Sequence, residues 1–438
     1  MREDRTRTRR RLAAAAAGAV ILAAAVAAGD VIELTNGRRY EGLVLEQDPM
    51  AVRFKVVFPK GGSMTRAFRR SEIKTLTLTG DAPTASAPED PPEKEDPPSD
   101  RPPRLSRDEV KGRIRVIGPS PPDWWNQVEL TYPDTLDLDG TQASGDGRPE
   151  VDLAAYVAER IRPDRRRWRE GVKLLHHVIK ARKADPARRA EAMELLGDLY
   201  FDLFNDWVRA AHWYETSMLH RRRVRAVLTV RLAECYWRIG SREMAVETLR
   251  RFRQDMHLPS AMAAQLWCQM GYAGGAMKMA EKMIADPQRA DEGHLAAGNI
   301  RRYTGRLDEA IEHYEQAAAL TTGSRYLERR RRRARANLAA VKALRSLDLS
   351  RVPDGAHRGE AVGYKGPVVV KVHVADGAIT GVEIVSRTED RAGRAFDNAA
   401  ERILVHPDFA GIDATTGAST TGDAVTNATI DALHKAQR

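Results

Sequence analysis

The sequence is poor in cysteine, with Cys235 and Cys268 as its two examples among 438 residues. Two distant cysteines without a spaced ligand pattern exclude a disulfide scaffold, a cysteine-ligated cluster and a c-type haem site. We expect both to be small core residues of helices. The alternative is a disulfide within a helical hairpin.

The sequence also lacks the patterns of common enzyme sites, since it shows no catalytic triad, general acid–base pair or nicotinamide-binding fingerprint. Four histidines lack partners at metal-ligand spacing and are predicted to be core or surface residues: His176, His177, His212 and His220. The net charge is +10, but the first 28 residues hold six arginines against two acidic residues, so removing them leaves +6. Without a groove-reading module, this modest charge argues against nucleic acid as a partner.

Long apolar runs are missing except near the N-terminus. Residues 1–28 resemble an export signal, with an arginine-rich start, an apolar run over 12–28 and small residues before Gly29. Residues 8–12 also loosely fit a twin-arginine pattern. We therefore expect an exported protein that is periplasmic or membrane-associated; an uncleaved anchor is the alternative.

Residues 29–80 predict a small all-β domain. Asn36-Gly37 joins two alternating apolar runs and a second turn lies at 60–63, which indicates about five short strands. The pattern resembles the small SH3-like or Sm-like β-barrels found at the start of exported bacterial proteins. Arg66, Arg69 and Arg70 are predicted to form a solvated basic edge, with an anion site as the alternative.

Residues 81–105 are rich in proline and acidic residues, so we expect an extended linker that cannot bury a core. Residues 106–150 hold too many large apolar groups for a linker. We expect them to form an extended arm that lays Trp124, Trp125 and Leu136 onto the following domain. Ligand stacking by the tryptophan pair is the alternative.

Residues 151–347 predict helical hairpins. Leu196-Gly197-x-x-Tyr200 recurs 36 positions later as Leu232-Ala233-x-x-Tyr236. Glycines at helix-to-helix turns, small residues after them and bulky residues further along recur at a similar period: Gly240, Gly274 and Gly305; Ala245, Ala280 and Ala310; Trp213, Leu249 and Tyr314. The pattern resembles the tetratricopeptide repeat and implies an α-solenoid that binds a partner peptide, another subunit or the attached C-terminal domain.

The last predicted helix of this array carries a polybasic stretch over 328–335. Its apolar positions, among them Leu338 and Val341, are expected to cap the solenoid. We predict that the arginines form the solvated outer face of this helix. A phosphate or lipid-headgroup site is the alternative.

Residues 352–438 predict a small α+β domain. Two alternating runs, 368–374 and 379–385, flank the turn Ala375-Asp376-Gly377 and form a β-hairpin. The apolar spacing then changes to that of a helix between Ala392 and Val405. A loop and a last amphipathic helix near Asp423 follow.

Three segments of this domain resemble the FMN-binding domain of sodium-pumping NADH:quinone reductases, Rnf-type complexes and many exported flavoproteins. They are the glycine-rich stretch 359–368, the hairpin stretch 376–384 and the loop 413–421. In that family a flavin transferase joins FMN through its phosphate to a serine or threonine hydroxyl. The resemblance implies Ser419 as the acceptor, with these residues around the phosphate or its recognition loop: Asp413, Thr416, Gly417, Ala418, Thr420 and Thr421.

The resemblance implies an exported redox carrier, rather than a substrate-specific enzyme, that holds FMN covalently at Ser419 and transfers electrons. Its expected partners are a flavin transferase, an unidentified redox protein and a protein bound by the repeats; membrane association stays open. Two other hypotheses remain: a tetratricopeptide scaffold whose flavin domain is structural, and a flavin-dependent reductase.

Overall fold

The computed structural model describes residues 30–47, 51–57, 63–69, 72–77, 104–133, 136, 152–182, 185–221, 224–256, 260–388, 393–412 and 419–438. The predicted export signal and the linker up to residue 103 lie outside these ranges. The chain forms two compact units, Met1–Glu89 and Asp90–Arg438. The described part contains no helix that is both long and apolar enough to cross a membrane.

The first unit is a five-stranded antiparallel sheet with the order β4-β3-β2-β1-β5. Its strands are β1 (Asp30–Leu34), β2 (Arg39–Gln47), β3 (Ala51–Val57), β4 (Ser63–Arg69) and β5 (Ile73–Thr77). Gly37 adopts φ 81° in the predicted first turn. Ile32, Phe54 and Phe68 lie in its core. The predicted small β-domain is therefore confirmed, while closure into a barrel is not among the pairings of the described strands.

The second unit begins with α2 (Arg107–Ile117) inside the segment predicted to be an extended arm. Its N-terminus is a capping box in which the Ser106 side chain accepts from the Glu109 N–H and the Glu109 carboxylate accepts from the Ser106 N–H. Beyond this helix the prediction holds, because Leu136 is buried in the core of the array. Trp124 stacks on Phe204 and Trp125 packs edge-on against His176.

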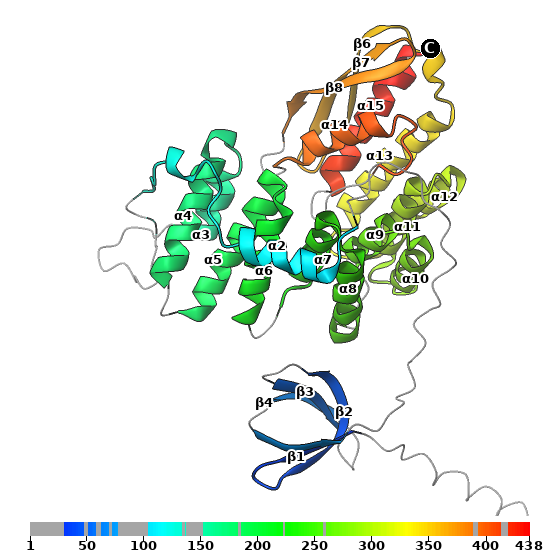
Figure 1. The fold of residues 1–438 in the computed structure, drawn as a ribbon. Coiled ribbons are helices and arrows are strands. Elements are labelled where there is room, and N and C mark those ends of the chain that lie inside the picture. The colour runs from blue at the N-terminus through cyan, green and yellow to red at the C-terminus, as the bar shows by residue number, and fades with distance from the viewer. Residues whose placement is uncertain are drawn as a thin grey trace, which may run out of the picture. The chain divides into compact units, whose positions relative to one another are not determined.

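The array itself consists of consecutive antiparallel helices (Figure 1). They are α3 (Leu153–Tyr156), α4 (Trp168–Ala181), α5 (Pro186–Leu199), α6 (Trp207–Leu219), α7 (Ala226–Ile239), α8 (Arg242–Met256), α9 (Ala261–Gln269), α10 (Ala273–Ile284), α11 (Ala290–Tyr303), α12 (Leu307–Ala319) and α13 (Leu327–Arg345). Both cysteines are buried and neither forms a disulfide, as expected for core residues.

Two details of the predicted repeat register are wrong. Gly274 lies inside α10, and the turn before that helix uses Gly271, which adopts φ 90°. The residue equivalent to Tyr314 is Tyr214 rather than Trp213. Each tyrosine ring packs on a helix glycine, Gly298 or Gly197, where a Cβ would lie 2.5–2.6 Å from the ring.

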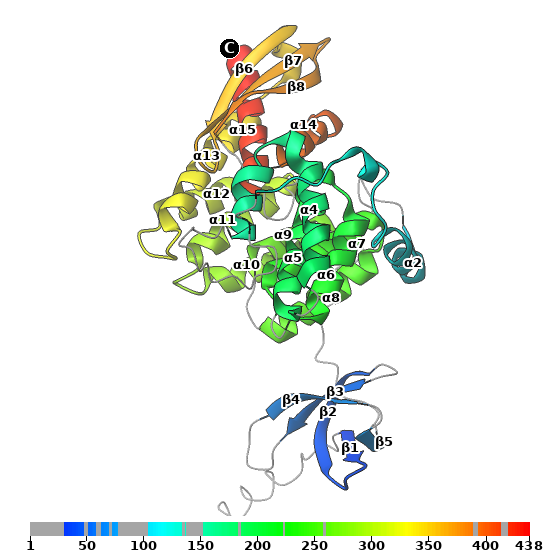
Figure 2. The same ribbon diagram turned by 90° about the vertical axis from the view of Figure 1, so that its left-hand side faces the viewer.

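The C-terminal part of this unit is the antiparallel sheet β6 (Gly355–Val362), β7 (Pro367–Ala375) and β8 (Ala378–Arg387), with β7 in the centre. The predicted hairpin is β7–β8, whose turn holds Asp376 and Gly377 at φ 51° and 70°. Strand β6, which the sequence analysis did not predict, contains residues 359–362 of the glycine-rich stretch. Helices α14 (Ala395–Val405) and α15 (Ser419–Ala436) cover one face of the sheet (Figure 2).

Helix α15 lies between this sheet and α13, so it is buried on nearly every side from Thr421 to Leu433. Small residues along the helix allow this packing. Gly359 of β6 meets it where a Cβ would lie 2.1 Å from the carbonyl oxygen of Ala428. The last helix is therefore shared between the core of the C-terminal domain and its contact with the helical array.

Candidate functional site

The first turn of α15 carries the described part of the predicted acceptor segment. Ser419 and Thr420 are half-buried at the start of the helix, and Thr421 is buried. The predicted residues Asp413, Thr416, Gly417 and Ala418 lie outside the described residues. A helix of this length presents unbonded backbone N–H groups and a partial positive charge at its N-terminus, which favours an anion there.

A cavity of about 280 Å³ opens beside this helix start. Its walls come from α15, α13, α11, the end of β6 and the β6–β7 connection. It is lined by Leu295, Tyr326, Arg329, Arg330, Arg332, Arg333, Val362, Gly363, Tyr364 and Thr420. Four arginines of the helical array therefore lie at a cavity that also includes the residue next to Ser419.

Two of the four arginines are neutralised by carboxylates. Arg330 pairs with Asp291 at 3.1 Å and with Glu292 at 3.2 Å. Burial acts to raise the pKa of Asp291, but hydrogen bonds from Ser324 and Arg330 outweigh it and hold the pKa below its usual value. Arg333 donates through Nε to Asp423 at 2.8 Å. These pairs join α13 to α11 and to α15.

The other two arginines contact Tyr364. Arg329 donates to the Tyr364 hydroxyl at 2.7 Å, and Arg332 donates to the Tyr364 carbonyl oxygen at 3.4 Å. The Arg329 guanidinium also lies 4.6 Å and 5.1 Å from the ring centroids of Tyr326 and Tyr364. Within the described ranges, no carboxylate pairs with Arg329 or Arg332. Their positive charge is therefore available to a ligand.

An orphan donor belongs to one of the arginines that line this cavity. Nη2 of Arg333 is buried and finds no hydrogen-bond partner among the described residues. A buried donor without an acceptor costs free energy, and an anionic oxygen would satisfy it. Together with the free arginines and the helix terminus, this donor fits a phosphate group.

The polybasic stretch of α13 is therefore only in part the solvated outer face predicted from the sequence. Its arginines at 329, 330, 332 and 333 line the cavity beside the C-terminal domain, and Arg332, like Arg335, is exposed. Spacings of three and four residues place these side chains on one face of the helix. That spacing was visible in the sequence, but the domain that packs against this face was not.

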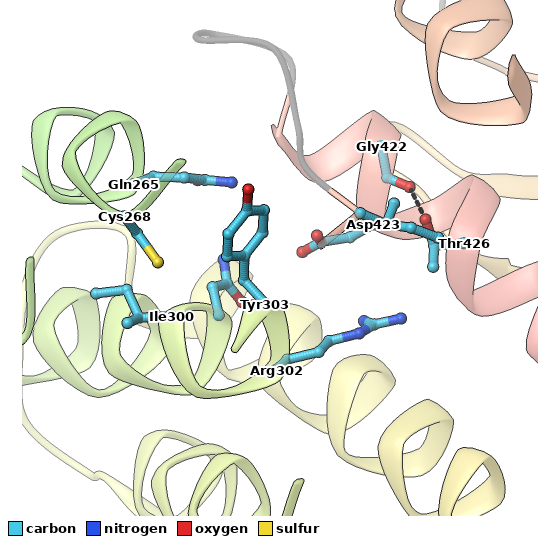
Figure 3. Close-up of a pocket in the computed structure, with 10 residues that line it drawn as sticks. Gln265, Cys268, Ile300, Arg302, Tyr303, Gly422, Asp423 and Thr426 are labelled. Atoms are coloured by element: carbon cyan, nitrogen blue, oxygen red, sulfur yellow. Dashed lines mark hydrogen bonds between the residues drawn. The ribbon is translucent and has the colours of Figure 1, made fainter. Parts of the chain in front are cut away.

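A second, smaller cavity lies on the other side of the α15 start. It has a volume of about 30 Å³ and is lined by residues of α9, α11 and α15, among them Gln265, Cys268, Tyr303 and Asp423 (Figure 3). This volume accommodates about a single water molecule. Of the two cavities beside the start of α15, the first is therefore the one with room for part of a flavin.

A buried polar network fixes the first turns of α15 against the array. Asn427 accepts from Arg302 at 2.7 Å and donates to Asn337 at 2.8 Å. Asn337 in turn donates to Asp423 at 2.9 Å and to Asn299 at 3.2 Å. These hydrogen bonds link α15 to α11 and α13. They hold the helix that begins with Ser419 in place against the array.

Comparison with known families agrees with this architecture. Residues 363–434 match the FMN-binding domain, and residues 291–321 match a tetratricopeptide repeat. The chain therefore carries a C-terminal FMN-binding domain preceded by a tetratricopeptide repeat. It is a flavin-binding protein with a repeat scaffold. No curated protein matches it significantly.

Proposed function

We propose that this chain is an exported flavoprotein that holds FMN through a phosphoester at Ser419 and transfers electrons to a partner protein. The observation that carries the proposal is the place of Ser419. Its hydroxyl belongs to the first turn of α15 in the FMN-binding domain, beside a cationic cavity with room for part of a flavin. When bound, FMN would supply one- and two-electron transfer at its ring.

The attachment step is a phosphoryl transfer without net oxidation. The Ser419 Oγ–P bond forms while the phosphorus–oxygen bond to the nucleotide of a flavin dinucleotide donor breaks. The nucleotide leaves as a monophosphate, and the serine proton passes to a base of the transferase. Ser419 and Thr420 hold the attachment point, and Arg329, Arg332 and Arg333 offer donors to the phosphate oxygens.

The repeat scaffold holds the FMN-binding domain of the same chain, and this leaves its remaining surface for a redox partner. Tetratricopeptide repeats generally mediate protein–protein interactions, which supports docking of such a partner. Contacts of the C-terminal domain run from Asn205, which exchanges amide hydrogen bonds with Asn398, to Tyr303, whose carbonyl accepts from Gly411. The repeats therefore hold the C-terminal domain of their own chain, in addition to binding any external partner.

The test is the intact mass and visible absorbance of the full chain, co-expressed with a flavin transferase and recovered after export. We expect a mass increase of one FMN residue that survives denaturation, is absent in Ser419→Ala and persists in Thr420→Ala. The intact mass also shows whether the exported chain begins near Gly29, as cleavage of the signal would require.

Three other outcomes decide among the alternatives. Flavin that dissociates on denaturation would mean non-covalent FMN. Turnover of the loaded protein with a defined acceptor would favour a reductase over a carrier. Absence of flavin in both forms would overturn the redox function and leave the scaffold hypothesis.

A further inference from the structure

Helix α13 ends the helical array, yet it contributes more side chains to the cavity beside Ser419 than the FMN-binding domain itself does. Arg329, Arg330, Arg332 and Arg333 come from α13, whereas the family match starts at residue 363. The cavity is therefore composite. A site formed by the FMN-binding domain alone would lack all four guanidinium groups.

We propose that Arg329 and Arg332 of the repeat scaffold bind the phosphate of the flavin. This inference rests on the proposed function, since it assigns the anion at Ser419 to these two residues. They act as binding residues that select the phosphate end of the cofactor, and the FMN site is complete only when the helical array is docked.

Their surroundings distinguish these arginines from their neighbours. Arg330 and Arg333 already pair with Asp291, Glu292 and Asp423. Arg331 turns to the other side of the helix, where it pairs with Glu328 at 2.6 Å and donates to the carbonyl oxygen of Ala318 at 3.1 Å. Arg329 and Arg332 thus bring the uncompensated charge to the cavity.

The geometry of Arg329 is that of a prepared anion site. Its guanidinium packs against Tyr326 and Tyr364 and donates to the Tyr364 hydroxyl, so the side chain is held in place before a ligand arrives. Arg332 reaches the backbone of the same tyrosine. Two guanidinium groups therefore lie beside Tyr364, in a cavity that Thr420 also lines. This arrangement suits the tetrahedral oxygens of a phosphate.

The test uses the full chain with Ser419→Ala, which removes the acceptor hydroxyl and leaves non-covalent binding to be measured. FMN and riboflavin are titrated separately and followed by quenching of flavin fluorescence. We expect FMN to bind at least about tenfold more tightly than riboflavin, because riboflavin lacks the phosphate and its charge-assisted hydrogen bonds. Adding Arg329→Gln and Arg332→Gln should remove most of this ratio while affinity for riboflavin stays unchanged.

Arg335→Gln is the matched control, since Arg335 lies in the same helix, carries the same charge and is exposed. It should preserve the FMN-to-riboflavin ratio. Equal binding of the two flavins, no binding of either, or equal ratios in the double variant and the control would each overturn the inference. Arginine-dependent binding to phosphatidylglycerol vesicles together with equal flavin affinities would assign the cluster to lipid phosphate and overturn it as well.

The two proposals fail separately. If the wild-type protein shows no mass increase, covalent attachment at Ser419 is overturned, whereas the FMN-to-riboflavin binding ratio can still be measured. A flavinylated wild-type protein whose Ser419→Ala form does not prefer FMN would retain the covalent site and remove the role of Arg329 and Arg332.

Discussion

The side chain of His176 lies inside the helical array between Trp125 and Trp213, with ring centroids 4.9 Å and 5.1 Å away. Its pKa is lowered to about 4, mainly by burial and to a smaller extent by the nearby charges of Lys180, Arg209 and His212. Its ring contacts are those of the core residue expected from the sequence. No cluster of potential metal ligands is found among the described residues.

This histidine makes stability depend on pH. The unfolded chain takes up a proton near pH 6.5, whereas the folded chain does so near pH 4. The folded state is therefore destabilised as the pH falls through this window. Between pH 7 and pH 5, His176 alone should lower the free energy of unfolding by about 2 kcal/mol. His176→Phe keeps an aromatic ring and should lose less stability over that range in urea unfolding. Exposed His220→Phe is the control; equal losses in both variants would contradict the assignment.

Single residues also show where reading the sequence succeeds. The packing of Trp124 and Leu136 on the helical array followed from their apolar size. The sequence did not predict that Arg329 and Arg332 lack a carboxylate partner. The carboxylates nearby come from distant parts of the sequence and pair with Arg330 and Arg333 instead.

At the scale of elements, strand β6 and helix α15 approach each other closely through Gly359. A Cβ at this position would lie 2.1 Å from the Ala428 carbonyl oxygen and 2.5 Å from the Ala432 nitrogen. Both are backbone atoms of a helix buried on nearly all sides, so neither moves without shifting α15. The start of α15 carries Ser419, which links this contact to the cofactor site.

Gly359→Ala should therefore destabilise the chain by about 3 kcal/mol, at the upper end of the range for overpacking, and reduce flavin attachment. Urea unfolding and intact mass measure the two effects. Gly381→Ala in β8 is the control, because a Cβ there meets its nearest neighbour, a His373 atom, at 3.5 Å. Similar stabilities of the two variants would show that the helix can move away.

The elements themselves were largely predictable where periodicity is strong, as in the β7–β8 hairpin and the helix pairs. Helix α2 was missed although Ser106-x-x-Glu109 is a capping-box pattern. Strand β6 was missed because its glycines and charged residues weaken the alternation, and only pairing with β7 makes it a strand. The turn at Gly271 was misplaced by three residues because Gly274 is also a glycine nearby.

At the scale of the second unit, the helical array and the FMN-binding domain meet along a continuous contact. Gly393 lies at one end, with φ 52° and its Cα facing the Asp202 carbonyl oxygen, and the network around Asn427 lies at the other. Asp202 also pairs with Arg231 at 3.2 Å, so its backbone is well fixed. No sequence pattern predicted this contact, since its partners lie far apart along the chain.

Gly393→Ala should open one end of this contact, because a Cβ would lie 2.4 Å from the Asp202 oxygen in a conformation that favours glycine. Hydrogen exchange should become faster in α14 and in the 202–206 segment. Gly355→Ala is the control, since that residue also has a positive φ but no atom within 4 Å of a Cβ. Faster exchange in both variants would indicate backbone strain rather than a lost contact.

The paired amides of Asn205 and Asn398 are 193 residues apart in the sequence. The repeats form through contacts between neighbouring helices, whereas this pairing requires everything between its two ends to be in place. We therefore expect this contact to form late in folding. Substitutions along it should accelerate unfolding more than they slow folding, so the lifetime of the docked domain is set there.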